Sequence, residues 1–93
     1  MLTMDYCISK DKNVPWRMIE REAILVDVGK GEVIHLNEVA AEIWDAIDGK
    51  KTINDIIKHI CNIFSIDEKT AEKDVLEFIQ KLLEKKLIEC SSG

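Results

Sequence analysis

The spacing of the apolar residues changes at Asn37, and this change constrains the fold more than any other feature of the sequence. Before Asn37, the segments Glu22–Val28 and Glu32–Leu36 are rich in the branched residues that favour β-strands. After Asn37, apolar residues recur at helical spacing almost to the end of the chain. Because 93 residues suffice for one domain but not for two, the strands and the helices are expected to form one small α+β domain.

The first part of the chain predicts a three-stranded antiparallel sheet. Its first strand begins at Trp16, directly after Pro15, and the two segments named above supply the second and third strands. The glycines of Gly29–Gly31 can take the positive φ that a short connection between strands requires. Because each strand follows its predecessor by a short link, the middle strand is expected to be central and Glu32–Leu36 to be an edge.

The two ends of the chain show little regular spacing of apolar residues. Residues 1–13 are polar and lack periodicity, so they are expected to form a flexible N-terminal arm. Leu87-Ile88 is expected to be a short segment that docks on the domain, and Ser91–Gly93 to be a tail of small residues. The single domain is therefore expected to span residues 14–90.

Three helices are predicted after the sheet, each with its own N-cap residue. Asn37 begins the first helix, Thr52 the second and Asp67 the third. The first helix should end at Gly49, and the third should run to about Lys85 or Lys86. The predicted architecture is therefore three strands followed by three helices, similar to a winged helix-turn-helix domain.

The third helix carries more apolar residues than a one-faced surface helix needs. Its apolar arc spans roughly 160°, against the ~100° of an ordinary surface helix. One explanation is a helix wedged between two elements of the core, and another is a groove for a partner along one edge of the arc. The residues of the arc are Ala71, Val75, Leu76, Phe78, Ile79, Leu82 and Leu83.

No pattern in the sequence indicates catalysis or a cofactor. Cys7, Cys61 and Cys90 are odd in number and widely spaced, which makes a poor disulfide framework, and they lack the close ligand spacing of a zinc site. His35 and His59 have no acidic or cysteine partner at ligand spacing, and no phosphate loop or nucleophile motif is present. No catalytic residue, metal or cofactor is therefore expected, and the protein is not expected to be an enzyme.

The charge of the third helix bears on nucleic-acid binding. Winged helix-turn-helix proteins often place their last helix on DNA, and that helix should then be basic. Here its acidic residues slightly outnumber its lysines, and the net charge of the chain is −5. Acidic charge repels phosphate, so nucleic acid is not an expected partner. A winged-helix DNA-binding regulator and an orphan protein-interaction domain are kept as alternatives to the function that follows.

The sequence also bears on location. No apolar run reaches the ~20 residues of a bilayer span, and the N-terminal segment MLTMDYCISK lacks the apolar core of a secretory signal. A cytoplasmic protein without a membrane partner is therefore expected.

Several short motifs, in order, resemble those of the PqqD-like proteins. His35–Asn37, Ala41–Trp44 and Asp48–Thr52 are similar to that family's "LN…A..IW…DG..T" pattern. The third helix resembles its "DV..F…L" pattern, and Leu87-Ile88 its closing "GLI", with Lys86 where the family has glycine. The resemblance extends from about Trp16 to Glu89. Lys86 predicts a strained left-handed residue, at a cost of ~1 kcal/mol, or a different helix end.

The resemblance implies a RiPP recognition element, a non-catalytic domain that binds the leader segment of a ribosomally made precursor peptide. Such domains present the precursor to a modifying enzyme, often of the radical-SAM type, in the biosynthesis of pyrroloquinoline quinone or of another peptide product. In the family, the leader adds as a strand to the third strand and packs on the third helix. The residues implied here are Glu32, Val33, Ile34, His35, Leu36, Asp74, Glu77, Phe78 and Lys81.

Each motif residue also has a plain structural explanation. Ile43 and Trp44 are expected in the core, and Asn37 is accounted for as a helix cap. Asp74 is the polar residue best placed to orient a leader peptide, although an ion pair with Lys73 or Lys81 would also explain it. The edge strand supports the peptide-binding function, because Glu32–Leu36 contains neither proline nor lysine to block strand addition.

Overall fold

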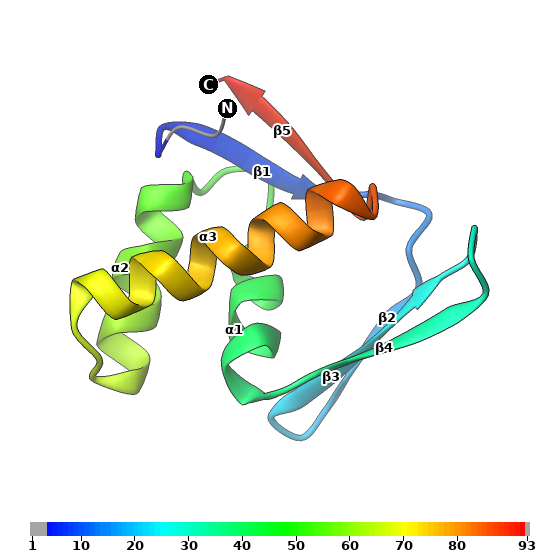
Figure 1. Cartoon of the computed structure of the whole chain (residues 1–93), viewed down its shortest axis with the longest axis horizontal. Coiled ribbons are helices and arrows are strands. Elements are labelled where there is room, and N and C mark those ends of the chain that lie inside the picture. Colours follow the sequence, from blue (N-terminus) through cyan, green and yellow to red (C-terminus); the bar gives the residue numbers. More distant parts are fainter. Residues whose placement is uncertain (1–3, 93) are drawn as a thin grey trace.

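The computed structural model describes residues 4–92, which form two antiparallel sheets and three helices (Figure 1). The predicted α+β fold, a three-stranded sheet followed by three helices, is confirmed. A second sheet of two strands joins the two ends of the chain. The elements are β1 (Tyr6–Lys10), β2 (Trp16–Ile19), β3 (Glu22–Asp27), β4 (Glu32–Leu36), α1 (Glu38–Ala46), α2 (Ile53–Phe64), α3 (Glu68–Glu84) and β5 (Ile88–Ser92).

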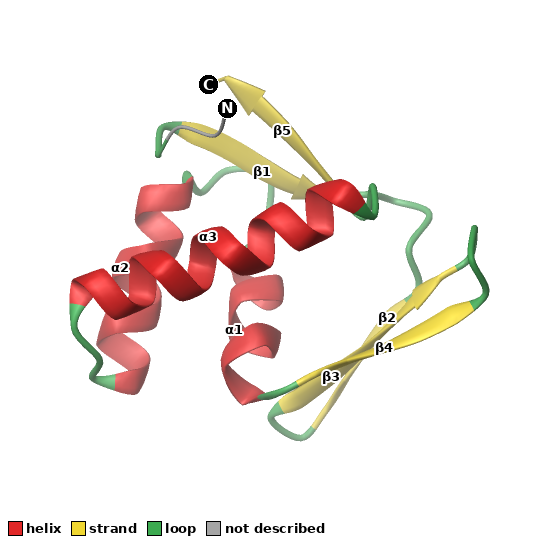
Figure 2. Ribbon diagram, in the orientation of Figure 1, coloured by secondary structure: helices red, strands yellow, loops and turns green. Residues whose placement is uncertain are grey.

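The three-stranded sheet has the predicted order, with β3 between β2 and β4. Side chains alternate between its two faces, as in any strand. Ala23 and Leu25 of β3 and Leu36 of β4 lie on one face and are buried. This face belongs to the hydrophobic core, to which the helices contribute most of the remaining buried residues. The helices thus lie to one side of the sheet (Figure 2).

The helices begin at the predicted caps. The side chain of Asn37 accepts a hydrogen bond from the backbone N–H of Ala40 at 2.9 Å. Thr52 and Asp55 form a reciprocal capping box at the start of α2, and Asp67 caps α3. Each cap satisfies N–H groups that lack a partner within the helix.

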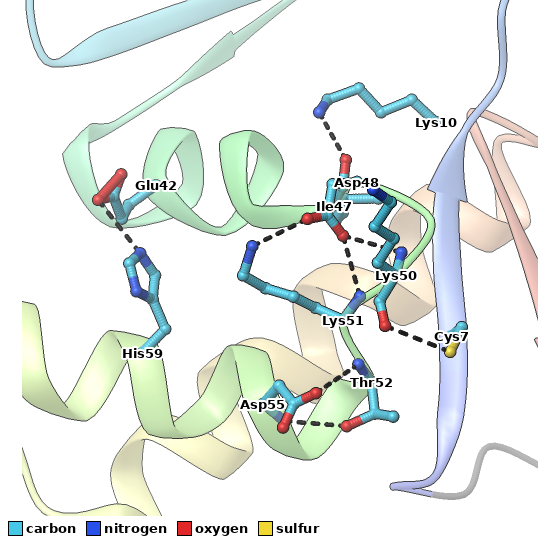
Figure 3. Close-up of polar contacts among 10 residues, drawn as sticks. All are labelled: Cys7, Lys10, Glu42, Ile47, Asp48, Lys50, Lys51, Thr52, Asp55 and His59. Carbon is cyan, nitrogen blue, oxygen red and sulfur yellow. Dashed lines mark hydrogen bonds and ion pairs between the residues drawn. The ribbon is translucent and has the colours of Figure 1, made fainter. Parts of the chain in front are cut away.

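The corner between α1 and α2 is held by the polar side chains in Figure 3. Asp48 Oδ1 accepts the backbone N–H groups of Lys50 and Lys51, both at 2.9 Å, and its Oδ2 contacts Lys51 Nζ at the same distance. The side-chain hydrogen bond from Lys51, followed by the two backbone bonds, holds the pKa of Asp48 well below its usual range. Gly49 has the positive φ of 81° that this turn requires. α1 itself ends at Ala46, three residues before the predicted Gly49, and its C-cap is Ile47.

The expectation of a flexible arm over residues 1–13 is wrong for Tyr6–Lys10, which form β1 and pair with β5. Ile8 is fully buried and anchors this strand to the core. This strand could not be detected from the sequence, because a single inward apolar residue in five positions produces no periodic pattern. β5 includes Ser91 and Ser92 of the expected tail, whereas residues 1–3 and Gly93 lie outside the described residues.

Trp44 of α1 is the largest fully buried side chain, as predicted for the core. Its ring packs edge-on against Trp16 of β2, with the ring centres 6.1 Å apart. The ammonium group of Lys10 lies 4.9 Å from the Trp16 ring centre and 5.5 Å from that of Trp44, and it donates to the carbonyl oxygen of Ile47 at 2.6 Å. Burial lowers the pKa of Lys10. This cluster joins β1, the three-stranded sheet and α1.

Candidate functional site

A hollow of about 310 Å³ lies between α1 and α3. From α3 it is lined by Asp74, Glu77, Phe78 and Lys81, which share one face of the helix because they are three or four residues apart. All four of these residues were predicted as peptide-binding residues from the sequence. The residues before and within α1 complete the lining: Asn37, Val39, Ala40 and Ile43. We refer to this site as the α1–α3 hollow.

The lining of the α1–α3 hollow is apolar where it is buried and charged where it is exposed. Ile43 is buried and Phe78 is half-buried, whereas Asp74, Glu77 and Lys81 are exposed. Two carboxylates and one ammonium group therefore surround an apolar surface. Such a site suits an apolar side chain with a polar or basic neighbour.

Asp74 has no ion-pair partner among the residues that the structure describes, so Lys73 and Lys81 do not neutralise it there. The alternative explanation of Asp74 as half of an ion pair on α3 therefore has no support in the geometry. Its carboxylate remains accessible to a ligand in the α1–α3 hollow.

The edge of the three-stranded sheet lies at β4, and the hydrogen-bond pattern shows which of its backbone groups are free. The N–H of Val26 in β3 donates to the carbonyl oxygen of Pro15, so the backbone groups of Val26 face β2. Because antiparallel strands alternate bonded and non-bonded pairs, Val33, opposite Val26, directs its N–H and C=O away from β3. The same holds for His35, whereas Ile34 is bonded to Leu25.

The five predicted strand residues do not line the α1–α3 hollow. Val33 and His35 are exposed, and Ile34 is half-buried. Leu36 is buried in the core, so its side chain is not accessible to a ligand. β4 nevertheless leads directly into Asn37, which does line the hollow. The free edge and the α1–α3 hollow are thus consecutive along the chain.

The part of the hollow contributed by α1 was not predicted from the sequence. Val39 and Ala40 belong to the apolar pattern of that helix, and nothing in the pattern distinguishes them from core residues. The available signal was Asn37, because a strand that turns directly into a helix places the first turn of the helix beside the strand's edge.

Within residues 4–92 no group of three or more histidine, cysteine or acidic side chains is arranged to hold a metal ion. His59, the histidine of α2, instead contacts Glu42 of α1, with Nε2 and Oε1 3.4 Å apart (Figure 3). None of the three helices is both long enough and apolar enough to span a membrane, as far as the described residues extend.

Comparisons with known proteins agree with this architecture. The family model described as Coenzyme PQQ synthesis protein D (PqqD) matches residues 22–88. The chain therefore belongs to the PqqD family, and the resemblance found in the sequence is confirmed. A solved structure, "TbiB1 in Complex with the TbiA(beta) Leader Peptide", is 28% identical with a TM-score of 0.78, covering 87% of this chain and 94% of that chain. No curated protein sequence matches the chain.

Proposed function

We propose that this protein is a RiPP recognition element, which binds the leader segment of a ribosomally made precursor peptide as an additional antiparallel strand on β4. The observation that carries the proposal is the juxtaposition of a free sheet edge with an apolar hollow that contains an accessible carboxylate. The match to the PqqD family and the similarity to a protein solved with a leader peptide support the same function.

Strand addition divides the binding energy between the two parts of the site. Backbone bonds to Val33 and His35 would supply affinity that depends little on the leader's sequence. Alternate side chains of the added strand would face the helical side of the sheet, where the α1–α3 hollow can accept an apolar side chain. Asp74 and Glu77 would favour a basic residue in the leader next to that side chain.

The protein would act without chemistry of its own and would present the bound precursor to a modifying enzyme. We propose an enzyme of the radical-SAM type and a cytoplasmic location, in a pathway to pyrroloquinoline quinone or to another peptide product. Separate binding and modifying proteins have a physical rationale. When another domain binds the leader and holds the precursor near the enzyme, the enzyme needs few contacts of its own with the precursor.

The test is a calorimetric titration of the protein with a synthetic peptide that copies the leader of a short precursor gene neighbouring the gene for this chain. A scrambled peptide of the same composition is the control. Amide chemical shifts recorded during the titration should change along Glu32–Leu36 and on the exposed face of α3. Changes confined to β2 or α2, or equal binding of the scrambled peptide, would contradict the proposal.

A further inference from the structure

The three-stranded sheet has a second face, which the helices leave uncovered (Figure 2). Its side chains are those that alternate with the buried residues Ala23, Leu25 and Leu36. We call this surface the outer face. Its members are Arg17, Ile19, Glu22, Ile24, Val26, Val33 and His35.

The outer face is more apolar than a solvated sheet surface should be. An antiparallel sheet with one face in water usually places polar residues on that face. Here four of the seven positions are valine or isoleucine, and Ile19 and Val33 are 46% and 64% exposed. Strand propensity alone does not require this, because threonine favours strands equally and none occurs there.

The outer face also contains a concavity. Ile24 and Val26 of β3, together with Pro15, Trp16 and Arg17, surround a hollow of about 240 Å³. Its lining is apolar apart from Arg17. A concavity of this kind can hold one projecting apolar side chain of another protein, as an anchor residue does in a protein interface.

We infer that the outer face is the docking surface for the modifying enzyme, which would contribute an apolar anchor residue beside a carboxylate. The inference rests on the proposed function. Charge complementarity supports this partner, because Arg17 of the edge strand β2 lines the concavity and suits a carboxylate beside the anchor residue.

Continuity with the leader site supports the same partner. A strand added to β4 extends the outer face by one strand, and half of its side chains would join that surface. An enzyme docked on the outer face would therefore contact the recognition element and the leader together, and it would bind the loaded domain more tightly than the empty one.

The experiment uses the double variant Ile24→Thr/Val26→Thr, which keeps the strand propensity of β3 and removes the apolar lining. The probe is the purified modifying enzyme encoded by a neighbouring gene, immobilised on a biosensor. We expect the enzyme to bind the variant roughly tenfold more weakly, while leader affinity in calorimetry stays within about twofold. The matched control is Ile63→Gln on α2, which changes another exposed isoleucine and should leave both affinities unaltered.

Unchanged enzyme binding by a double variant that still binds the leader overturns the docking inference and leaves the proposed function intact. If the wild-type protein does not bind the leader, the proposed function is overturned instead. If the double variant fails to fold, Arg17→Glu provides the second test, and it should weaken enzyme binding by a similar factor. A wild-type dimer that Arg17→Glu converts to a monomer in analytical ultracentrifugation would assign the outer face to a second copy and overturn the inference.

Discussion

The backbone N–H of Val26 lies 2.9 Å from the carbonyl oxygen of Pro15, and this bond determines which groups of β4 are free to bind a peptide. Since Val26 faces β2, its partner Val33 faces solvent, and so does His35 two residues later. His35→Pro removes an outward N–H and places a ring in the path of an incoming strand. We expect this variant to remain folded and to lose measurable leader binding in calorimetry.

Ile34→Pro is the matched control, because Ile34 bonds inward to Leu25. Proline there should remove a hydrogen bond between β3 and β4, and the free energy of unfolding should fall. The two adjacent substitutions are thus expected to separate binding from folding. Retained leader affinity in His35→Pro would exclude strand addition on β4.

Phe78 and Leu76 lie on opposite edges of the wide apolar arc of α3, and both are half-buried. Phe78 lines the α1–α3 hollow, whereas Leu76 does not. We expect Phe78→Ala and Leu76→Ala to lower the free energy of unfolding by similar amounts of about 2 kcal/mol, less than a fully buried ring would cost. Of the two variants, only Phe78→Ala should also lower the affinity for the leader peptide. Equal leader affinity of the two variants, measured by calorimetry below their melting temperatures, would contradict this assignment.

The elements of the fold that could be predicted from the sequence depend on local signals. Asn37, Thr52 and Asp67 cap their helices through bonds to residues three positions away, and alternation along β3 identifies its buried face. The pairing of β1 with β5 depends instead on contacts between the two ends of the chain. Such a pairing leaves no periodic trace in a short strand with one buried residue, so local reasoning could not find it.

The site was predictable to the same extent. The resemblance to the PqqD-like proteins pointed to α3 and to the third strand, while helical spacing grouped the residues of α3 and the order of the short links placed β4 at an edge. The bond between Val26 and Pro15 determines which backbone groups of β4 face outward. This bond depends on how β2 and β3 pair, which cannot be predicted from either segment alone.

Asp74→Asn tests whether the accessible carboxylate orients the leader. The substitution keeps the size of the side chain and removes its charge, and Asp74 has no ion pair to lose within the described residues. We expect leader affinity to fall several-fold, on the order of 1 kcal/mol for one charge-assisted hydrogen bond, with an unchanged melting temperature. Glu84→Gln, an exposed residue of α3 outside the α1–α3 hollow, is the control and should bind normally.

The free energy of unfolding should depend on pH through three hydrogen-bonded carboxylates. Hydrogen bonds from Lys51, Thr52 and Thr70 lower the pKa values of Asp48, Asp55 and Asp67 respectively. A folded-state pKa below the unfolded value of about 3.9 stabilises the protein above that pH, and the contribution is lost as the pH falls toward the folded value. The urea midpoint should therefore be level above about pH 5 and fall below pH 4. Asp48→Asn should make this decline shallower, and an identical profile for the variant would argue against the contribution of Asp48.

The end of α3 offers a stabilising substitution. Lys86 has a φ of 60°, and the N–H groups of Lys86 and Leu87 donate to the carbonyl oxygens of Leu83 and Leu82, both at 3.0 Å. This is a Schellman motif whose left-handed position is usually glycine, so the predicted strained residue is the one found. Lys86→Gly should raise the free energy of unfolding by about 1 kcal/mol and the melting temperature by about 4–8 °C. Lys85→Gly is the control, because Lys85 has a right-handed helical backbone with a φ of −85°. Glycine at this position should lower the free energy of unfolding. Differential scanning calorimetry of the two variants measures both effects, and a melting temperature of Lys86→Gly at or below that of the wild type would show that Lys86 is not under strain.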